Sequence, residues 1–352
     1  MRLKPLRILL LSALALVLSV AGYFTLGALS RDRLEVRPAT VHASLSRESC
    51  VECHAPIAAE WRKSFHFRSV TGPFWDRIRK KGFADLFRAL RVPCMNCHAP
   101  ANVLDLAAKA HPVERSDAPE LGVDCVSCHV SERGIAGPGR SVAAPHEVVV
   151  DDRFRDPMLA SNTLCARCHA EAAQADVVQE WRQTPFASRG IACPDCHMPK
   201  VTAPSVVAGP PRERRSHEFL GDKDANMLRR ALDASIRIAG DRTAIVRVTN
   251  TGAGHSFPAA GTNWLIVKLQ VRDAAGQTVG EAERRFGTKE WIPGYLDFWP
   301  FLQVTKIPHG ESREVALGLP AGQGTIAAEL RYRDWFALTD QDIVFATLTE
   351  TY

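Results

Sequence analysis

The 352-residue sequence has no stretch of low complexity, and it has no cysteine outside one repeated motif. All ten cysteines lie in five copies of Cys-x-x-Cys-His, at residues 50–54, 94–98, 125–129, 165–169 and 193–197. No cysteine therefore remains for a disulfide that would stabilise a domain.

Each copy of the motif is typical of a covalent c-type haem attachment site. The two cysteine sulfurs bind the two vinyl groups of a haem, and the adjacent histidine binds the iron from the proximal side. Zinc sites built from paired cysteines, or a thioredoxin-like redox motif, do not require a histidine after every second cysteine. We expect five covalently attached haems, held by Cys50, Cys53 and His54; Cys94, Cys97 and His98; Cys125, Cys128 and His129; Cys165, Cys168 and His169; and Cys193, Cys196 and His197.

The N-terminal segment predicts export. An uncharged, mostly apolar run over residues 8–29 follows the basic residues Arg2, Lys4 and Arg7. Residues 19–21 have the small side chains of a signal-peptidase site, yet the whole run is also long enough to span a bilayer, which needs about 20 residues. Residues 1–30 are therefore either a cleaved signal or a membrane anchor. Both predict a location in the periplasm or on the outer face of the cytoplasmic membrane.

The formal net charge of +5 overstates how basic the mature protein is. It falls to +2 without the three N-terminal basic residues, and five haems would add about ten propionate groups. The composition thus gives no reason to expect nucleic acid as a partner. Residues 75–90 predict an amphipathic helix with one basic face, which is either a solvated surface or a docking site for an acidic redox protein.

Residues 31–225 are rich in cysteine, histidine and proline and predict a pentahaem domain of short helices and loops around the cofactors. An internal repeat lies within it. The segment EWRKSFHFRS (60–69) between the first two motifs has a counterpart in EWRQTPFAS (180–188) between the last two. His66 of the first copy is replaced by Phe186 in the second, so we expect the fourth-motif haem to lack a ligand supplied in this way.

Residues 226–352 predict a second domain, because short segments of alternating polarity are separated by turn sequences. This pattern favours an antiparallel β-sandwich of immunoglobulin-like type. The expected strands are residues 235–238, 244–249, 265–272, 313–319, 327–332 and 343–349, with turns at 273–277 and 321–324.

Seven histidines lie outside the motifs, which exceeds the five positions on the opposite, distal faces of the irons. His66 follows Trp61 and Phe65 on a predicted short helix, and His255 lies in a glycine-rich loop that would allow close approach to a haem. The candidate distal ligands are His66, His255, His217, His146 and His111; His42 and His309 are expected to be ordinary exposed residues. The methionines are weaker candidates, so we expect mainly bis-histidine haems of low potential.

Several of these segments together resemble a known family. They are the first motif with WRKSFH (61–66), and then GVDCVSCH (122–129), CPDCHMP (193–199), RSHEF (215–219) and GAGHSFP (252–258). They are similar to the multihaem c-type cytochromes related to the tetrahaem cytochrome that accepts electrons from hydroxylamine oxidoreductase. Haem packing in that group is also similar to that in ammonia-forming nitrite reductase.

The resemblance implies closely stacked haems, with His66, His217 and His255 in distal positions. The chain departs from the family pattern at Phe186, in its fifth haem and in its β-domain. It also lacks the Cys-x-x-Cys-Lys haem site of ammonia-forming nitrite reductase, because all five motifs end in histidine.

The leading hypothesis is an electron-transfer protein that relays electrons between redox partner proteins, without a catalytic residue of its own. The alternative is a reductase of a small nitrogen or sulfur compound, such as nitrite or hydroxylamine, at one five-coordinate haem. The apolar residue Phe186 motivates the alternative. A membrane-anchored quinol dehydrogenase would use the apolar run at 8–29 but fits the β-domain poorly, and a filament subunit is supported by no local sequence feature.

Overall fold

The computed structural model describes residues 47–71, 75, 94–106, 112–116, 118–140, 146–170, 177–240, 242–259, 263–289, 303–334 and 342–352. The predicted export segment lies outside these ranges, and so does all of the helix predicted over 75–90 except Trp75. Within them, no helix is long and apolar enough to cross a membrane.

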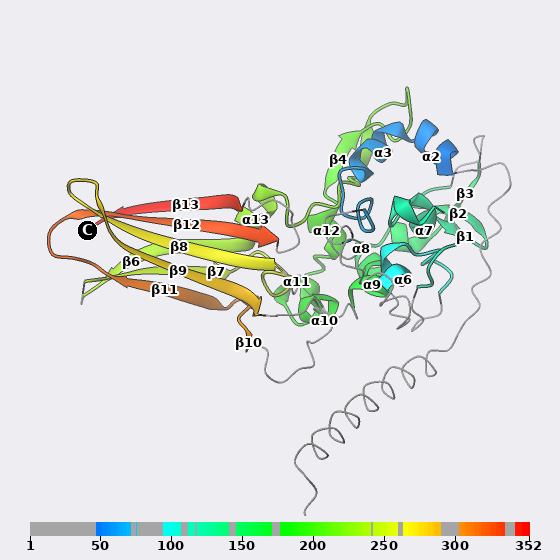
Figure 1. Cartoon of the computed structure of the whole chain (residues 1–352). Coiled ribbons are helices and arrows are strands. Elements are labelled where there is room, and N and C mark those ends of the chain that lie inside the picture. Colours follow the sequence, from blue (N-terminus) through cyan, green and yellow to red (C-terminus); the bar gives the residue numbers. More distant parts are fainter. Residues whose placement is uncertain are drawn as a thin grey trace, which may run out of the picture.

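Short helices dominate the first part of the described chain (Figure 1). They are α2 (Arg47–Cys53), α3 (Ala55–Trp61), α6 (Cys94–His98), η1 (Pro119–Leu121), α7 (Cys125–His129), η2 (Asp152–Phe154), α8 (Pro157–Ala160), the π-helical turn η3 (Ser161–Cys165), α9 (Ala166–His169), α10 (Val177–Arg182), α11 (Pro185–Ser188) and α12 (Cys193–His197). Small sheets lie among them, namely β1 (Val130–Ser131), β2 (Gly134–Gly137) and β3 (Val148–Val150), and then β4 (Lys200–Ala203) with β5 (Arg212–Arg215).

Every Cys-x-x-Cys-His motif lies on a helical turn. Residues i, i+3 and i+4 of a helix share one face, so the motif spacing places both sulfurs and the imidazole on the same side. Aspartate side chains cap the start of several short helices. Asp124, for example, accepts the backbone N–H of Ser127 at 3.0 Å and so fixes the start of α7.

Helix α13 (Ala225–Ala231) leads into two antiparallel sheets. The first has the strand order β11–β7–β6 and the second β10–β9–β8–β12–β13. The strands are β6 (Leu232–Ala239), β7 (Thr243–Asn250), β8 (Asn263–Asp273), β9 (Thr278–Lys289), β10 (Gln303–Val304), β11 (Ser312–Gly318), β12 (Gly324–Asp334) and β13 (Ile343–Thr351). All six predicted strands and both predicted turns are present, whereas β9 and β10 were not predicted.

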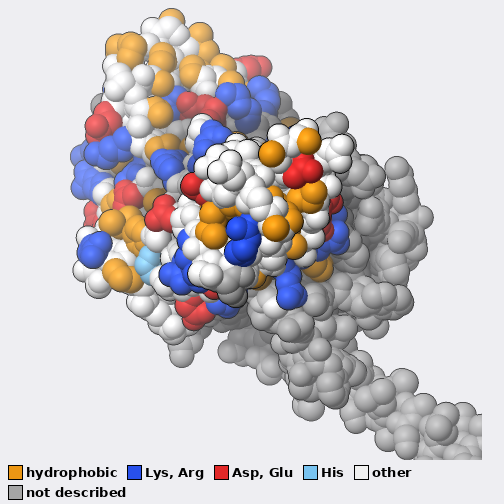
Figure 2. All heavy atoms as spheres, turned by 90° about the vertical axis from the view of Figure 1, so that its left-hand side faces the viewer, with side chains coloured by type: hydrophobic (Ala, Val, Ile, Leu, Met, Phe, Trp, Pro, Cys, Tyr) orange, Lys and Arg blue, Asp and Glu red, His pale blue; other side chains and the backbone are white. Residues whose placement is uncertain are grey.

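The two sheets share one hydrophobic core, to which alternate residues of the long strands contribute. Val246 and Val248 of β7 face Leu265, Val267 and Leu269 of β8, and all five are fully buried. Seen from the end far from the short helices, the surface mixes basic, acidic and apolar side chains (Figure 2). The sandwich therefore has a core of its own, independent of cofactors.

Part-buried polar contacts join the β-domain to the segment that precedes it. Asn263 and Tyr332 both donate to the Asp222 carboxylate, at 2.8 and 2.9 Å. The ring of Phe186 on α11 also packs edge-on against His309, with centroids 5.1 Å apart. The loops at this end of the β-domain thus lie against helices α10 and α11, which carry the second copy of the repeat (Figure 1).

Candidate haem ligand sites

The motif histidines are oriented by backbone carbonyl groups. Each of four rings has its Nδ1 within hydrogen-bond distance of a carbonyl oxygen: His54 to Ser205 at 2.9 Å, His98 to Ser69 at 2.8 Å, His129 to Ala136 at 2.9 Å and His197 to Leu220 at 2.5 Å. An N–H at Nδ1 leaves Nε2 as the ring's electron-pair donor. Such outer contacts fix both the tautomer and the ring orientation of a metal ligand.

Four motif histidines have a second histidine opposite them at a nearly constant distance. The ring centroids are 6.2 Å apart for His54 and His146, 6.3 Å for His169 and His66, 6.3 Å for His129 and His217, and 6.4 Å for His197 and His255. In every pair the second ring comes from a distant segment of the chain.

This separation fits one metal ion between two imidazoles. A metal–imidazole bond is about 2.0 Å long and a ring nitrogen lies about 1.1 Å from the ring centre, so two rings on opposite sides of one metal have centres about 6.2 Å apart. The described residues contain no group of three or more His, Cys, Asp or Glu side chains arranged to hold a bare metal ion. The donor set, two cysteine sulfurs and two facing imidazoles, would suit a c-type haem better than a zinc site.

The placement of Phe186 corrects one expectation. The fourth-motif histidine, His169, does not lack a partner, because His66 from the first repeat lies opposite it. The first repeat thus places a histidine opposite the motif histidine of the second repeat, so a residue's position in its own repeat does not say which motif it faces. Phe186 packs on His309 of the β-domain instead.

His98 is the motif histidine for which no second histidine ring is found among the described residues. Its ring packs edge-on against Trp75, with centroids 5.2 Å apart. The candidate His111 lies outside the described residues, and so does His42, which was expected to be an ordinary exposed residue. His309 is part-buried and its Nδ1 lies 3.0 Å from the carbonyl of Ala253, so it was wrongly expected to be exposed.

Burial favours the neutral, ligating form of five of the paired histidines. It lowers the pKa of His66 to about 3 and the pKa values of His169 and His217 to about 4. The pKa values of His129 and His255 are lowered for the same reason. At neutral pH each of these rings is therefore uncharged, and one of its two nitrogens has no proton and can bind a metal.

The repeated segment that contains Trp61 and Trp181 has a structural role. The repeat was visible in the sequence, but the contacts that its residues make were not. Each indole N–H donates to a carbonyl, of Val123 at 2.8 Å and of Ile191 at 3.0 Å. One residue before each tryptophan, Glu60 and Glu180 bind the backbone of two other segments, those of the second histidines His217 and His255. The glutamates were not predicted as site residues, although their repetition was visible.

Neighbouring pairs lie close to one another. Phe219 contacts the rings of both His66 and His217, at centroid distances of 4.3 and 5.9 Å. The side chain of Cys165 lies beside that of Cys193, and the side chain of Cys168 lies beside that of Cys97. The fourth motif thus lies against the second and the fifth motifs.

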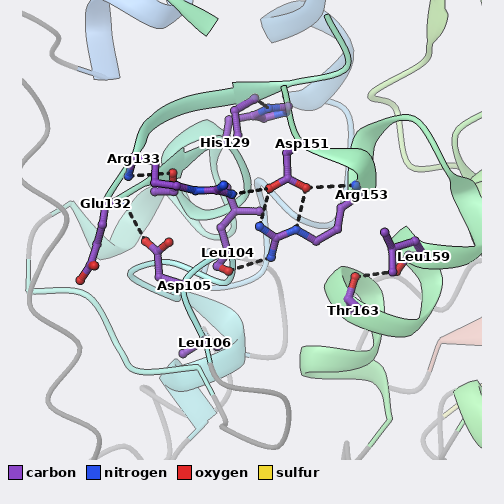
Figure 3. Close-up of polar contacts among 12 residues, drawn as sticks. Leu104, Asp105, Leu106, His129, Glu132, Arg133, Asp151, Arg153, Leu159 and Thr163 are labelled. Carbon is purple, nitrogen blue, oxygen red and sulfur yellow. Dashed lines mark hydrogen bonds and ion pairs between the residues drawn. The ribbon is translucent and has the colours of Figure 1, made fainter. Parts of the chain in front are cut away.

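An ionic network holds the segment that carries His146 (Figure 3). Strand β3 begins two residues after His146 and pairs with β2, whose Ala136 orients His129. Asp151, directly after β3, accepts hydrogen bonds from Arg153, whose Nη1 donates to the Leu104 carbonyl at 2.7 Å. Two ligands of different pairs are therefore fixed by one small sheet.

Comparisons with known proteins agree with this geometry. The family model for cytochrome c554 and c-prime matches residues 49–130 and 146–198. No protein of curated function matches the chain.

Among solved structures, a penta-haem cytochrome c552 from Thermochromatium tepidum matches 88% of this chain and 99% of its own, with a TM-score of 0.61 at 19% identity. ApaA from Bordetella pertussis matches 34% of this chain and 89% of its own at 14% identity. Its TM-score of 0.20 is too low to indicate a shared overall fold. The chain therefore has the fold of a multihaem c-type cytochrome with a C-terminal antiparallel β-domain.

Proposed function

We propose that this chain is an exported electron-transfer protein that holds five covalently bound c-type haems, most of them between two histidines. The observation that carries the proposal is the set of four histidine pairs with ring centroids 6.2–6.4 Å apart. Haem iron supplies reversible one-electron oxidation and reduction when it is bound. Iron that has two protein ligands offers no position for a substrate.

The side chains and carbonyl groups of this protein would then do three things. The motif cysteines attach the cofactor, the carbonyls of Ser205, Ser69, Ala136 and Leu220 orient the proximal rings, and the second histidines close the opposite faces. Rigid ligand pairs favour rapid electron transfer, because little has to move when the charge changes. The partners are expected to be donor and acceptor redox proteins outside the cytoplasm.

The proposed architecture has an export segment or membrane anchor at 1–30, a pentahaem domain at 31–225 and an immunoglobulin-like domain at 226–352. The close contact between the fourth motif and its neighbours supports haem-to-haem transfer within the protein. Phe219 contacts a ring of the third-motif pair and a ring of the fourth-motif pair.

The pyridine haemochrome assay, intact mass, and low-temperature EPR of the purified holoprotein test this proposal. Five haems per chain are expected, with four low-spin signals of bis-histidine type. Carbon monoxide added to the reduced protein should bind at no more than one haem per chain. Fewer than five haems, or two or more high-spin haems, would refute the proposal.

A second candidate function is supported by the surroundings of His98. Because no second histidine faces His98 among the described residues, a reductase of nitrite or hydroxylamine would use this site. It requires a stoichiometric high-spin signal and turnover that is abolished by carbon monoxide or cyanide. A fully low-spin spectrum would exclude the reductase and favour the relay.

A further inference from the structure

The two copies of the repeat each place a glutamate against a segment that bears a second histidine. In the first copy, the Glu60 carboxylate accepts the backbone N–H of His217 at 2.8 Å. The same carboxylate is bound by both terminal nitrogens of Arg214, each at 2.8 Å. The side chains of Arg214 and Glu60 are only 9% and 18% exposed, so the negative charge is neutralised where it lies.

The second copy is built differently. The Glu180 carboxylate accepts the backbone N–H of Ser256 at 2.8 Å and its hydroxyl at 2.9 Å, and Ser256 directly follows His255. These contacts connect the helical part to the β-domain. Among the ion pairs of the described residues, none joins Glu180 to a lysine or an arginine. The second carboxylate therefore has no guanidinium bound to it. The cation that acts on His255 together with Glu180 is the buried Lys306, whose ammonium group donates to the Ala259 carbonyl at 2.9 Å.

We propose that Glu60 and Glu180 are equivalent positioning residues for His217 and His255, and that only Glu180 lowers the reduction potential of its haem. This inference rests on the proposed function, because it assumes haem iron between His197 and His255. A carboxylate near an iron ligand favours the ferric over the ferrous state, since the ferric state carries one more positive charge. The Glu60–Arg214 pair has almost no net charge and has little such effect.

Glu180→Gln separates charge from position. The glutamine carbonyl can accept the Ser256 N–H, and its amide can donate to the Ser256 hydroxyl oxygen, so both contacts persist while the charge is lost. We expect about a tenfold shift of one ferric–ferrous equilibrium towards the ferrous state. For a one-electron couple this shift equals 59 mV upward in midpoint potential. An EPR-monitored redox titration of the holoprotein follows each low-spin haem separately.

Two control variants isolate the effect. Ser256→Ala removes the hydroxyl contact but keeps the charge, and is expected to leave all midpoint potentials unchanged. Glu60→Gln combined with Arg214→Gln removes both charges of the first pair, and is expected to shift the potential of the His129/His217 haem by less than Glu180→Gln shifts its own. Glu180→Ala should release His255 in part and produce a high-spin signal, which Glu180→Gln restores to low spin.

The inference is overturned if Glu180→Gln leaves every midpoint potential unchanged, or if either control shifts a potential as much. It is also overturned if Glu180→Ala keeps both the full low-spin spectrum and the potentials. The haem count is read from the same samples, so a failure of this inference with five haems present is distinct from a failure of the proposed function.

Discussion

The ion pair of Asp151 and Arg153 gives a prediction whose magnitude follows from the contacts. The Asp151 side chain is 6% exposed and accepts from Nε of Arg153 at 2.8 Å, from its Nη2 at 2.5 Å and from its backbone N–H at 3.0 Å. Asp151→Ala removes an N-cap, which costs about 0.5–2 kcal/mol, and leaves a largely buried guanidinium unpaired. Breaking a fully buried pair costs about 3–5 kcal/mol, but Arg153 keeps some solvent contact and its bond to Leu104. We expect a total of about 3 kcal/mol.

The assay is thermal unfolding of the holoprotein, followed by circular dichroism in the haem absorption region so that the haem domain is observed. For a unit of 150–250 residues, about 3 kcal/mol lowers Tm by about 6–12 °C. Arg133→Ala is the matched control, because Arg133 contacts the same carboxylate at 3.4 Å with a side chain that is 65% exposed. Its loss should cost no more than about 1 kcal/mol. Equal Tm values for the two variants would refute the argument from burial.

The same carboxylate predicts a dependence on pH. The hydrogen bonds from Arg153 lower the pKa of Asp151 below its ordinary value of 3.8. The ion pair therefore stabilises the folded state above pH 3.8, and this contribution is lost as the pH falls through the pKa of the folded protein. The Tm difference between the wild type and Asp151→Asn should be complete at pH 7 and shrink below pH 3.8. A difference that does not change with pH would show that the charge is not involved.

Two further substitutions test the ligand assignments. His66→Ala should convert one low-spin haem to a high-spin haem that binds carbon monoxide, while the pyridine haemochrome count stays the same; an unchanged EPR spectrum would contradict the pairing with His169. Gly122→Ala should produce part of the same signal, because at φ +65° its Cβ would lie 2.2 Å from the carbonyl oxygen of His66. Gly276→Ala is its control, since φ is +79° there but no atom lies within 4 Å of the added Cβ, so only Tm should fall slightly.

Local patterns were sufficient to predict the parts of this fold that depend on local geometry. The motif spacing of i, i+3 and i+4 determines which side chains share a helical face, and period-two alternation identified six strands. Strand β9 was missed because its sequence contains two glycines and several charges, and Val279 near its start is 45% exposed. Its pairing with the buried strand β8 along almost its whole length makes it a strand.

The pairing of the histidines, in contrast, could not be predicted from local sequence patterns. The sequence indicated His66, His217 and His255 as ligand candidates, but no local pattern relates His66 to His169 rather than to a motif nearer in the chain. Packing determines which histidines face one another. For example, Phe219 contacts the ring of His66, and the Glu60 carboxylate accepts the backbone N–H of His217. Local chemistry indicated the candidate ligands, and only the three-dimensional fold shows which histidines face one another.

The order of the paired histidines along the chain has a consequence for how the protein can be divided. His146 lies between His66 and His169, His169 lies between His129 and His217, and His197 lies between His129 and His217. The pairs are interlocked, so a cut anywhere from His54 to His255 separates at least one pair. A fragment that ends at residue 225 would keep all five attachment motifs but lose His255. Such a chain could be loaded with every cofactor and still assemble incompletely, because the boundary between the domains is not a boundary between ligand sets.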